Sequence, residues 1–409
     1  MPECRSCEAQ LDPNLVFVDL GSMPLVNALL TSEQLDEPEV HYPLRALVCP
    51  QCLLVQLPVA PDPKILFRSD YPFYSGQSRA WVEHCCNLSS ALITKHQLQM
   101  GRHHVLEIGS NDGTLLDAFQ GAGFDVTGVE PCHEVAEASK AKGIPTWEWF
   151  WGIEAALIFM ESGYRADLVL ATNVLAHVPE PRAFLGGIRE VLARKGRVVI
   201  EVPYVADMMA ENRWDQIYHE HHCYFSLTSL SYLARKALLH VIDVEHVPVH
   251  GGSLRVTLGH LGESSPSPRV SAFLNSEIEI GLDRVSTYRH VSQGPNESRD
   301  SWWAWRPTIQ GDVVGYGASA KAAVFCNFCG IDRDHLSYIV DTTPSKQGKY
   351  QPGTRIPIVG DLLLRYNPRT VVNFCWNWRR ESEANIREHA PGARIVYPDE
   401  LTTGSKVAA

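Results

Sequence analysis

The stretch HVLEIGSNDGTLLDAFQGAGFDVTGVEP, residues 104–131, decides the fold class of this chain. Val105 to Ile108 form a short apolar run typical of a buried strand, and a glycine-rich turn follows at 109–113. Thr114 to Gln120 have the apolar spacing of a helix, and 124–129 is a second apolar run. This order predicts a β-loop-α-β unit whose glycines let the backbone approach a ligand closely.

The loop of this unit carries acidic side chains. Its pattern E-x-G-x-N-x-G differs from the dinucleotide pattern G-x-G-x-x-G, whose first glycine makes room for a pyrophosphate. Glu130 ends the second strand, where a carboxylate can accept both hydroxyls of a ribose. Glu107 and Asp112 suit the cationic methionine part of S-adenosylmethionine, a nucleoside without phosphate. The alternative is an α/β unit whose glycine turn binds nothing.

Further strands alternate with helices along the chain. Ala166 to Ala171 read as a buried strand followed by Thr172-Asn173, and Gly196 to Ile200 begin another strand after a helix. This alternation predicts a mostly parallel, doubly wound sheet, in which ligands bind at the carboxyl ends of the strands. His177 follows Asn173 by one helical turn and can face the same crevice. We expect the cofactor to contact Glu107, Gly109, Asn111, Asp112, Gly113, Glu130 and Asn173.

Two C-x-x-C pairs near the N-terminus, Cys4 with Cys7 and Cys49 with Cys52, predict a zinc site. Four thiolates complete the tetrahedral shell of Zn²⁺ and leave no open position, so the predicted role is structural. The stretch between the pairs is polar and dotted with prolines, and we expect it to bury little surface without the metal. Two unrelated reduced pairs, or a redox site, are the alternatives.

The segment YHEHH at 218–222 concentrates groups that can move protons. Its histidines and Glu220 can act as acid or base near neutral pH, and the Tyr218 phenol can donate a hydrogen bond to a developing oxyanion. The segment lacks the histidine pair of H-E-x-x-H, which argues against a catalytic metal. A polar surface turn is the alternative.

A second glycine turn, GYGASAKA at 315–322, follows an apolar run and opens a helix. Its backbone N–H groups, the helix N-terminus and Lys321 can hold a diphosphate. Lys346, Gln347 and Arg355 follow in a loop rich in glycine and proline and can hold an anionic, sugar-bearing ligand. A scaffold unit without a ligand is the alternative.

Composition limits the partners. The chain has 409 residues, with 36 basic against 47 acidic side chains, a net charge of −11 that argues against a nucleic-acid surface. The start Met-Pro-Glu-Cys lacks the features of a signal peptide, and no apolar run is long enough to cross a bilayer. We expect a cytoplasmic monomer with reduced cysteines and without a membrane partner.

The motifs taken in order resemble the nucleotide-sugar C-methyltransferases, which include the enzyme that methylates C3 of a dTDP-linked 4-keto-deoxysugar in tetronitrose formation. The resemblance runs nearly end to end. It rests on the paired C-x-x-C module, LFRSDYPFYSGQS at 66–78, LEIGSNDGTLL at 106–116, GVEP at 128–131, NVLAHVP at 173–179, YHEHHCYFS at 218–226, HGGSLRV at 250–256, GYGASAKA at 315–322 and VDTTPSKQGKYQPGTRIPI at 340–358.

The resemblance implies an α/β protein with three functional domains. These are a zinc-binding module at 1–65, a Rossmann-like S-adenosylmethionine domain at 66–265 and, after a helical connection at 266–308, a Rossmann-like nucleotide-sugar domain at 309–405. The aromatic runs Trp147 to Trp151 and Trp376 to Arg380 depart from the expected family pattern.

The resemblance also implies roles for single residues. His221 is expected to be the general base, flanked by Tyr218 and Glu220, with His177 close to the reacting carbon. Tyr74 is expected to contact the sugar substrate. The implied reaction removes a proton from C3 beside a 4-ketone, and the enolate takes the methyl group of the sulfonium in line.

Three other functions compete with this interpretation. An O- or N-methyltransferase of a related nucleotide sugar needs no acidic carbon. A nicotinamide-dependent oxidoreductase would use the C-terminal unit, although GYGASAKA lacks the final glycine of the dinucleotide pattern. A non-catalytic zinc adaptor would leave the segment 218–222 without a purpose.

Overall fold

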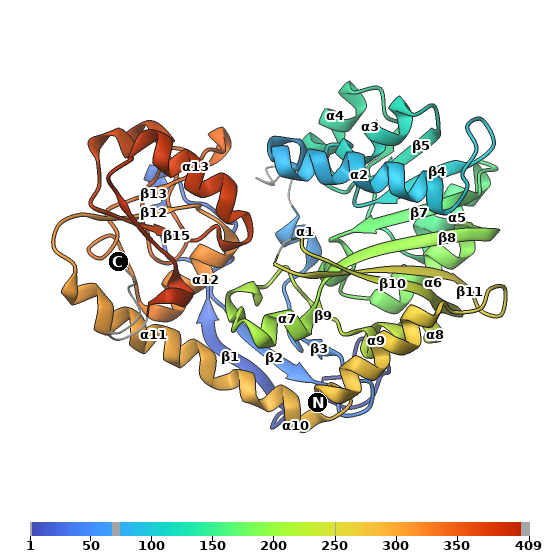
Figure 1. Cartoon of the computed structure of the whole chain (residues 1–409), viewed down its shortest axis with the longest axis horizontal. Coiled ribbons are helices and arrows are strands. Elements are labelled where there is room, and N and C mark those ends of the chain that lie inside the picture. The colour runs from blue at the N-terminus through green and yellow to red at the C-terminus, as the bar shows by residue number, and fades with distance from the viewer. Residues whose placement is uncertain (1, 68–73, 250, 402–409) are drawn as a thin grey trace.

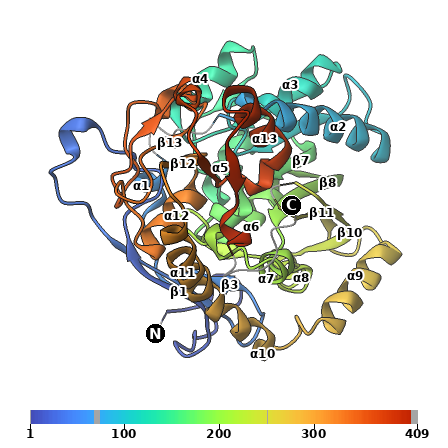
Figure 2. The same cartoon turned by 60° about the vertical axis from the view of Figure 1, so that its left-hand side comes forward.

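The computed structural model describes residues 2–67, 74–249 and 251–401. Two α/β lobes stand side by side on a common base (Figure 1). The right-hand lobe contains a seven-stranded sheet and the left-hand lobe a five-stranded sheet, while a small four-stranded sheet belongs to the base. Figure 2 brings the left-hand lobe forward, with helix α11 (Gly294–Trp305) running beneath it. In these described ranges we find no helix with the length and apolar character to cross a membrane.

The seven-stranded sheet confirms the doubly wound fold that the sequence predicts. Its order is β10-β11-β8-β7-β4-β5-β6, in which β4 to β8 run parallel and β10 and β11 add an antiparallel hairpin at one edge. The strands are β4 (His104–Ile108), β5 (Asp125–Val129), β6 (Thr146–Trp147), β7 (Ala166–Thr172), β8 (Leu192–Pro203), β10 (Leu239–Val247) and β11 (Ser253–His260).

Helices cover both faces of this sheet because alternate strand residues point to opposite sides. Val105 and Leu168 pack with helices α2 (Arg79–Lys95) and α3 (Thr114–Gly121), whereas Leu106 and Val169 pack with α5 (Ile153–Glu161) and α6 (Pro181–Val191). The lobe also contains α4 (His133–Ala141), α7 (Val205–Ala210) and α8 (Leu227–Lys236).

The N-terminal stretch corrects one expectation. Strands β1 (Val16–Met23) and β2 (Tyr42–Val48) pair between the two C-x-x-C motifs and bury Phe17, Val18 and Leu44 completely. The idea that this stretch buries little surface is therefore wrong. Strand β3 (Val55–Gln56) continues the sheet and pairs with β9 (Cys223–Tyr224), which follows the YHEHH segment directly. A short helix, α1 (Pro63–Leu66), follows β3 in the chain.

The left-hand lobe is a second, smaller parallel sheet. Its order is β14-β13-β12-β15-β16, with strands β12 (Val313–Tyr316), β13 (Ile339–Val340), β14 (Ile358–Val359), β15 (Thr370–Asn373) and β16 (Arg394–Val396). Helices α12 (Ala320–Cys329) and α13 (Arg379–His389) belong to it. Helices α9 (Pro268–Glu279), α10 (Val285–Tyr288) and α11 connect the two lobes along the base (Figure 1).

The crossover in strand order fixes where a ligand can enter. From β4 the chain continues to β5 on one side of β4, and it later returns to β7 on the other side. The loops that follow β4 and β7 therefore lead in opposite directions, which leaves a crevice at the carboxyl ends of these two strands. Gly109 lies there at φ +67, and an added Cβ would come within 2.4 Å of Val174. Any other residue would be strained at this positive φ and would push the Val174 side chain away.

Candidate active site

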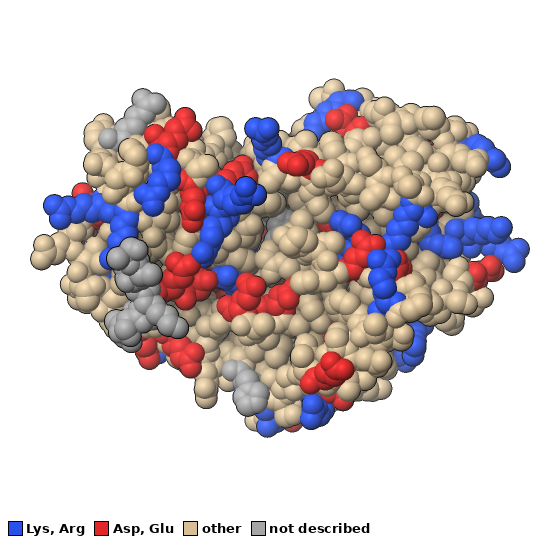
Figure 3. Space-filling view, viewed as in Figure 1, with Lys and Arg blue, Asp and Glu red and all other residues tan. Residues whose placement is uncertain are grey.

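A cavity of about 600 Å³ lies at the carboxyl ends of the strands and reaches from the seven-stranded sheet to the C-terminal lobe. Figure 3 shows the notch between the two lobes on this face of the molecule. The cavity wall contains eleven of the predicted cofactor, catalytic and substrate residues: Glu107, Gly109, Asn111, Glu130, Asn173, His177, Tyr218, Glu220, His221, Lys321 and Lys346. The structure therefore brings together the motifs of both lobes.

Glu107 offers an unused acceptor to the cavity. Its carboxylate is buried, Oε2 has no hydrogen-bond partner in the described part of the chain, and Oε1 accepts only from the Thr172 hydroxyl at 3.3 Å. Burial raises the pKa of Glu107 well above its ordinary value. A cationic ligand would satisfy this carboxylate and return its pKa toward the normal range, which fits the amino group or sulfonium of S-adenosylmethionine.

Glu130 has a fixed orientation in the same wall. Its Oε1 accepts from the backbone N–H of Cys132 at 2.9 Å, and Oε2 accepts from that of Asn111 at 3.0 Å. Burial raises the pKa of Glu130, and these two hydrogen bonds oppose the shift. The remaining acceptor positions of the carboxylate suit the hydroxyls of a ribose.

Two predicted cofactor residues, Asp112 and Gly113, are not in the cavity wall. Asp112 Oδ2 accepts from the backbone N–H of Gly76 at 3.0 Å, and Oδ1 accepts from the Thr114 hydroxyl at 2.6 Å. Asp112 thus ties the loop around Gly76 to the start of α3. We assign it to holding this loop, which contributes Ser75 to the cavity wall.

The aromatic run after β6 also contributes to the cofactor end of the cavity. Trp149, Phe150 and Trp151 line the wall near Glu130 and Pro131. Flat apolar side chains in the wall that also contains Glu130 suit a purine ring. This unusual sequence therefore has a place in the site.

The YHEHH segment is buried, which rules out the surface-turn alternative. Residues 218–222 are each at most 9 % exposed. His221 Nδ1 lies 3.0 Å from the carbonyl oxygen of Gln216, so this nitrogen carries the hydrogen. Nε2 then has a lone pair, and the Tyr218 hydroxyl donates to it at 2.8 Å. The arrangement presents His221 as a neutral imidazole with its basic nitrogen on the Tyr218 side.

Burial keeps this imidazole neutral. Desolvation, followed by the repulsion that two protonated rings at His177 and His221 would have and by the charge of Lys321, lowers the pKa of His221 well below its ordinary value. Burial likewise raises the pKa of Tyr218, and the charge of Glu220 adds to this shift. At neutral pH the pair therefore consists of a protonated phenol and a basic imidazole nitrogen.

His177 lies at the end of the short helix after β7 and faces the same pair. Its ring centroid is 4.7 Å from that of His221, in an edge-on arrangement. It hydrogen-bonds to the backbone of Glu220, and its Nδ1 has no partner among the described residues. Desolvation lowers the pKa of His177 to about 4, so this ring is also neutral.

Sequence reasoning missed Asn27, which reaches this cluster from the N-terminal module. The Asn27 side-chain amide donates to Glu220 Oε1 at 2.6 Å, and Asn27 lies in the cavity wall. In the sequence it is a single asparagine inside the apolar run PLVNALL at 24–30. Nothing in one sequence distinguishes it from a turn residue.

The C-terminal lobe contributes two lysines. Lys321 lines the cavity near the start of α12, and desolvation lowers its pKa. Lys346 Nζ donates to the carbonyl oxygen of Ala318 at 3.0 Å and lies 3.3 Å from Asp341 Oδ2. Cationic groups beside a helix N-terminus suit a phosphate group.

Three predicted substrate residues are not in the wall. Gln347 Nε2 donates to the carbonyl oxygen of Asp341 at 3.0 Å, and Arg355 points to the N-terminal module, where Nη2 donates to the carbonyl oxygen of Glu37 at 3.4 Å. Tyr74 directly precedes the wall residue Ser75 in the chain. Residues 68–73 of the motif at 66–78, and His250 of the motif at 250–256, lie outside the described residues.

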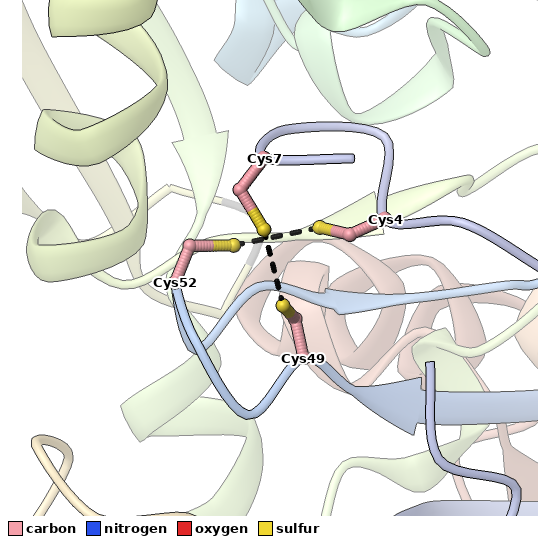
Figure 4. A group of neighbouring side chains, drawn as sticks. All are labelled: Cys4, Cys7, Cys49 and Cys52. Atoms are coloured by element: carbon pink, nitrogen blue, oxygen red, sulfur yellow. Dashed lines mark hydrogen bonds between the residues drawn. The ribbon is translucent and has the colours of Figure 1, made fainter. Parts of the chain in front are cut away.

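The four cysteines converge as the sequence predicts (Figure 4). Their sulfur atoms all lie within 4.8 Å of one another, with Cys4 and Cys52 at 3.5 Å and Cys7 and Cys49 at 3.4 Å. Thiolates on one zinc ion lie about 3.7 Å apart, because Zn–S bonds are about 2.3 Å long. The Gln56 amide donates to Cys4 Sγ at 3.1 Å, which supports a charged thiolate. The donor set fits a closed structural zinc site.

A doubly wound sheet with two buried carboxylates, Glu107 and Glu130, at its switch point fits the class of S-adenosylmethionine-dependent methyltransferases. Matches to protein-family models agree with this class. Residues 76–244 match "Methyltransferase domain", residues 248–398 match "C-methyltransferase C-terminal domain", and residues 4–67 match "Putative zinc binding domain". C-methyltransferase NovU of Streptomyces niveus is 31 % identical over 405 residues, 97 % of this chain and 95 % of that protein. The chain belongs to this C-methyltransferase family.

Two similar solved structures each cover less than half of the chain. Magnesium protoporphyrin IX methyltransferase (ChlM) of Synechocystis PCC 6803, with bound SAM, is 13 % identical and covers 43 % of this chain and 78 % of its own, with a TM-score of 0.33. The methyltransferase CcbJ of Streptomyces caelestis is 15 % identical and covers 42 % and 89 %, with a TM-score of 0.32. At these scores the likeness adds nothing to the family assignment.

Proposed function

We propose that this C-methyltransferase acts on C3 of a nucleotide-linked 4-keto-6-deoxysugar and that His221 removes the C3 proton. The observation that carries the proposal is the neutral Tyr218–His221 pair at the wall of a cavity that also contains Glu107 and Lys321. A carbon nucleophile requires a base, whereas oxygen methylation of an already acidic group does not. The resemblance in motif order supports a ketosugar as the source of that carbon.

The buried pair can carry out both proton movements that enolate formation needs. The C3–H bond breaks, its proton goes to His221 Nε2, and its electron pair forms the C3–C4 double bond as the C4 oxygen becomes an enolate. Tyr218 then donates its hydroxyl hydrogen to this oxygen instead of to Nε2. A phenol with a raised pKa keeps its proton until an anion forms beside it, which makes it a suitable donor.

The second step needs only orientation by the protein. S-adenosylmethionine supplies a methyl group on a positively charged sulfur. The C3 carbon takes this methyl group, and the electron pair of the C–S bond stays on sulfur. Glu107 and Glu130 would hold the donor, and the same cavity wall contains His177 and His221.

The C-terminal lobe holds the nucleotide in this proposal. Lys346 and the N-terminus of α12 bind the diphosphate, and Lys321, whose charge lowers the pKa of His221, lines the same cavity. Gln347 and Arg355 then support the loop and its contact with the N-terminal module. Tyr74 stays a proposed sugar contact through its place beside Ser75.

A mass-spectrometric assay with S-adenosylmethionine and dTDP- or GDP-linked 4-keto-6-deoxysugars tests the proposal. We expect the product of at least one sugar to gain the mass of a single methyl substitution at carbon. The matched 4-hydroxy sugar, which cannot form the enolate, should gain none. Methylation of the 4-hydroxy sugar would instead show an O- or N-methyltransferase, and no gain on any ketosugar would refute the proposal.

A further inference from the structure

The N-terminal module extends into the cavity through the loop that follows β1. This loop places the half-buried Asn27 in the cavity wall, where its amide donates to Glu220 Oε1 at 2.6 Å. A short hydrogen bond from an amide to a carboxylate is stronger than one between neutral groups. The zinc-binding module therefore contacts the histidine cluster directly.

The loop that carries Asn27 is held on both sides. Val26 and Leu30 are buried, and Leu30 exchanges two backbone hydrogen bonds with Tyr350 of the C-terminal lobe, at 3.0 and 2.9 Å. A loop anchored in the core and in a neighbouring lobe presents its side chain in one position. Asn27 is thus pre-organised to meet Glu220.

The partner segment is held by the same module. Strand β3 pairs with β9, and the backbone N–H of Leu57 donates to the carbonyl oxygen of His222 at 3.0 Å. The segment 218–222 is consequently fixed at its end by β3 and at Glu220 by Asn27. Both contacts come from the zinc-binding module, while the base itself belongs to the methyltransferase lobe.

Glu220 connects this contact to the chemistry. Its backbone hydrogen-bonds to His177, and its charge acts on Tyr218, the hydroxyl donor of the proposed mechanism. A carboxylate that turned away from its position would change the electrostatic field at Tyr218. Asn27 can hold it without adding a charge that would pair with it.

We propose that Asn27 is a positioning residue for C3 deprotonation: its amide holds in place the Glu220 carboxylate, whose charge acts on Tyr218. The proposal rests on the proposed function, because it assigns Asn27 to that proton transfer. It makes the N-terminal module a contributor to the active site in addition to its structural zinc.

The test compares two asparagine-to-aspartate variants in the same module. Asn27→Asp places a carboxylate against Glu220. Asn14→Asp is the matched control, because the exposed Asn14 also donates its amide to a carboxylate, that of Asp12 at 3.0 Å, far from the cavity wall. Asn27→Ala removes the donor without adding charge. The readouts are zinc content, S-adenosylmethionine affinity, C3 hydrogen exchange in D₂O, and kcat and KM.

We expect Asn27→Ala to slow C3 exchange and kcat by about 10- to 100-fold, the range for a lost partner of a charged site residue. Zinc content, cofactor affinity and KM should stay close to wild type, as should every readout of Asn14→Asp. Exchange at the wild-type rate in Asn27→Ala would overturn the proposal. Parallel loss of zinc or cofactor binding would also overturn it, because the role would then be structural.

The pH dependence of Asn27→Asp separates positioning from general damage. Two adjacent carboxylates share one proton at low pH, and the protonated oxygen can then donate to the other as Asn27 does. Tyr218 and His177, the titratable neighbours of Glu220, are the same in both proteins. We expect the kcat ratio of variant to wild type to rise as pH falls, whereas a ratio independent of pH would contradict the proposal. Absence of exchange in wild type on every ketosugar would refute the proposed function instead.

Discussion

Replacing His221 tests the proposed base most directly, and the structure provides two complementary variants. Asn at 221 can keep a donor toward the Gln216 carbonyl, whereas Gln at 221 can place an amide oxygen near Nε2 and accept from the Tyr218 hydroxyl. Neither amide can take a proton near neutral pH. Each variant therefore preserves one of the two hydrogen bonds of His221 while removing its basicity.

The expected loss follows from the role of a general base. Such a group contributes about 10²- to 10⁴-fold to a rate, so both variants should slow C3 exchange by at least about 100-fold. His221→Asn leaves the buried Tyr218 hydroxyl without its acceptor, which costs about 1–3 kcal/mol of stability. His221→Gln should cost less, because the acceptor is retained.

Proton NMR in D₂O measures the exchange directly. Loss of the C3–H signal is followed on the ketosugar without methyl donor, so methyl transfer does not enter the rate. Calorimetric titration with S-adenosylmethionine should give wild-type affinity for both variants, because Glu107 and Glu130 are unchanged. Exchange at the wild-type rate in either variant would remove His221 from the mechanism.

Three further outcomes follow from the burial of charged and titratable groups. Glu107→Gln should weaken S-adenosylmethionine binding by about 10-fold or more and remove the pH dependence of that binding. In wild type the affinity should fall as pH drops through the raised pKa of Glu107, because only the ionised carboxylate attracts a cation. Calorimetric titration of the control variant Glu154→Gln, at an exposed position, should show wild-type affinity. Replacing Cys4 and Cys49 by serine should remove zinc and lower the melting temperature and activity. The reason is that Arg5, next to Cys4, donates its backbone N–H to Gln56 at 2.8 Å and its Nη1 to the Pro179 carbonyl at 2.6 Å, so the zinc site holds these contacts in place. A metal-free protein with wild-type melting temperature and activity would contradict the structural role. The pKa values of His177 and His222 are lowered to about 4 and about 3. The free energy of unfolding, measured with urea, should therefore be highest above pH 6.5 and decline as pH falls toward these values, by up to ~1.4 kcal/mol per pH unit for each histidine. A free energy of unfolding that stays constant from pH 7 to 4 would show that these rings are not buried in the neutral form.

Local sequence patterns predicted the fold, because the apolar residues of each strand indicate which of its faces are buried. Val105 and Leu106 belong to one continuous apolar run, as expected for a parallel strand covered on both faces, and their separate core clusters confirm it. Strand β1 escaped prediction for a physical reason. Its register shifts between Val16 and Val18 and again between Asp19 and Ser22, so the alternation of apolar and polar residues is broken.

The site was predictable where a motif and its ligand lie in one segment. Glu107 is the last residue but one of β4 and Glu130 directly follows β5, and the carboxyl ends of parallel strands meet at one edge of a sheet. Asn27 and Arg355 show the limit. Each is placed by contacts between domains, Asn27 on Glu220 and Arg355 near Glu39, at 2.6 and 3.9 Å. Such contacts depend on how the lobes pack, and one sequence carries no local signal of that packing.

The lowered pKa of His221 has a consequence for how the site discriminates between substrate and water. A proton arriving on this ring creates a buried cation close to the positive charge of Lys321, which is unfavourable unless an anion forms at the same time. In the proposed reaction the ketosugar supplies this anion, because its enolate would form as the C3 proton moves to the ring. Proton transfer is therefore favourable only with the ketone in place, because the new imidazolium and the new enolate stabilise each other. In the proposed mechanism, the burial that lowers the pKa of His221 thus makes proton transfer to this ring depend on the substrate.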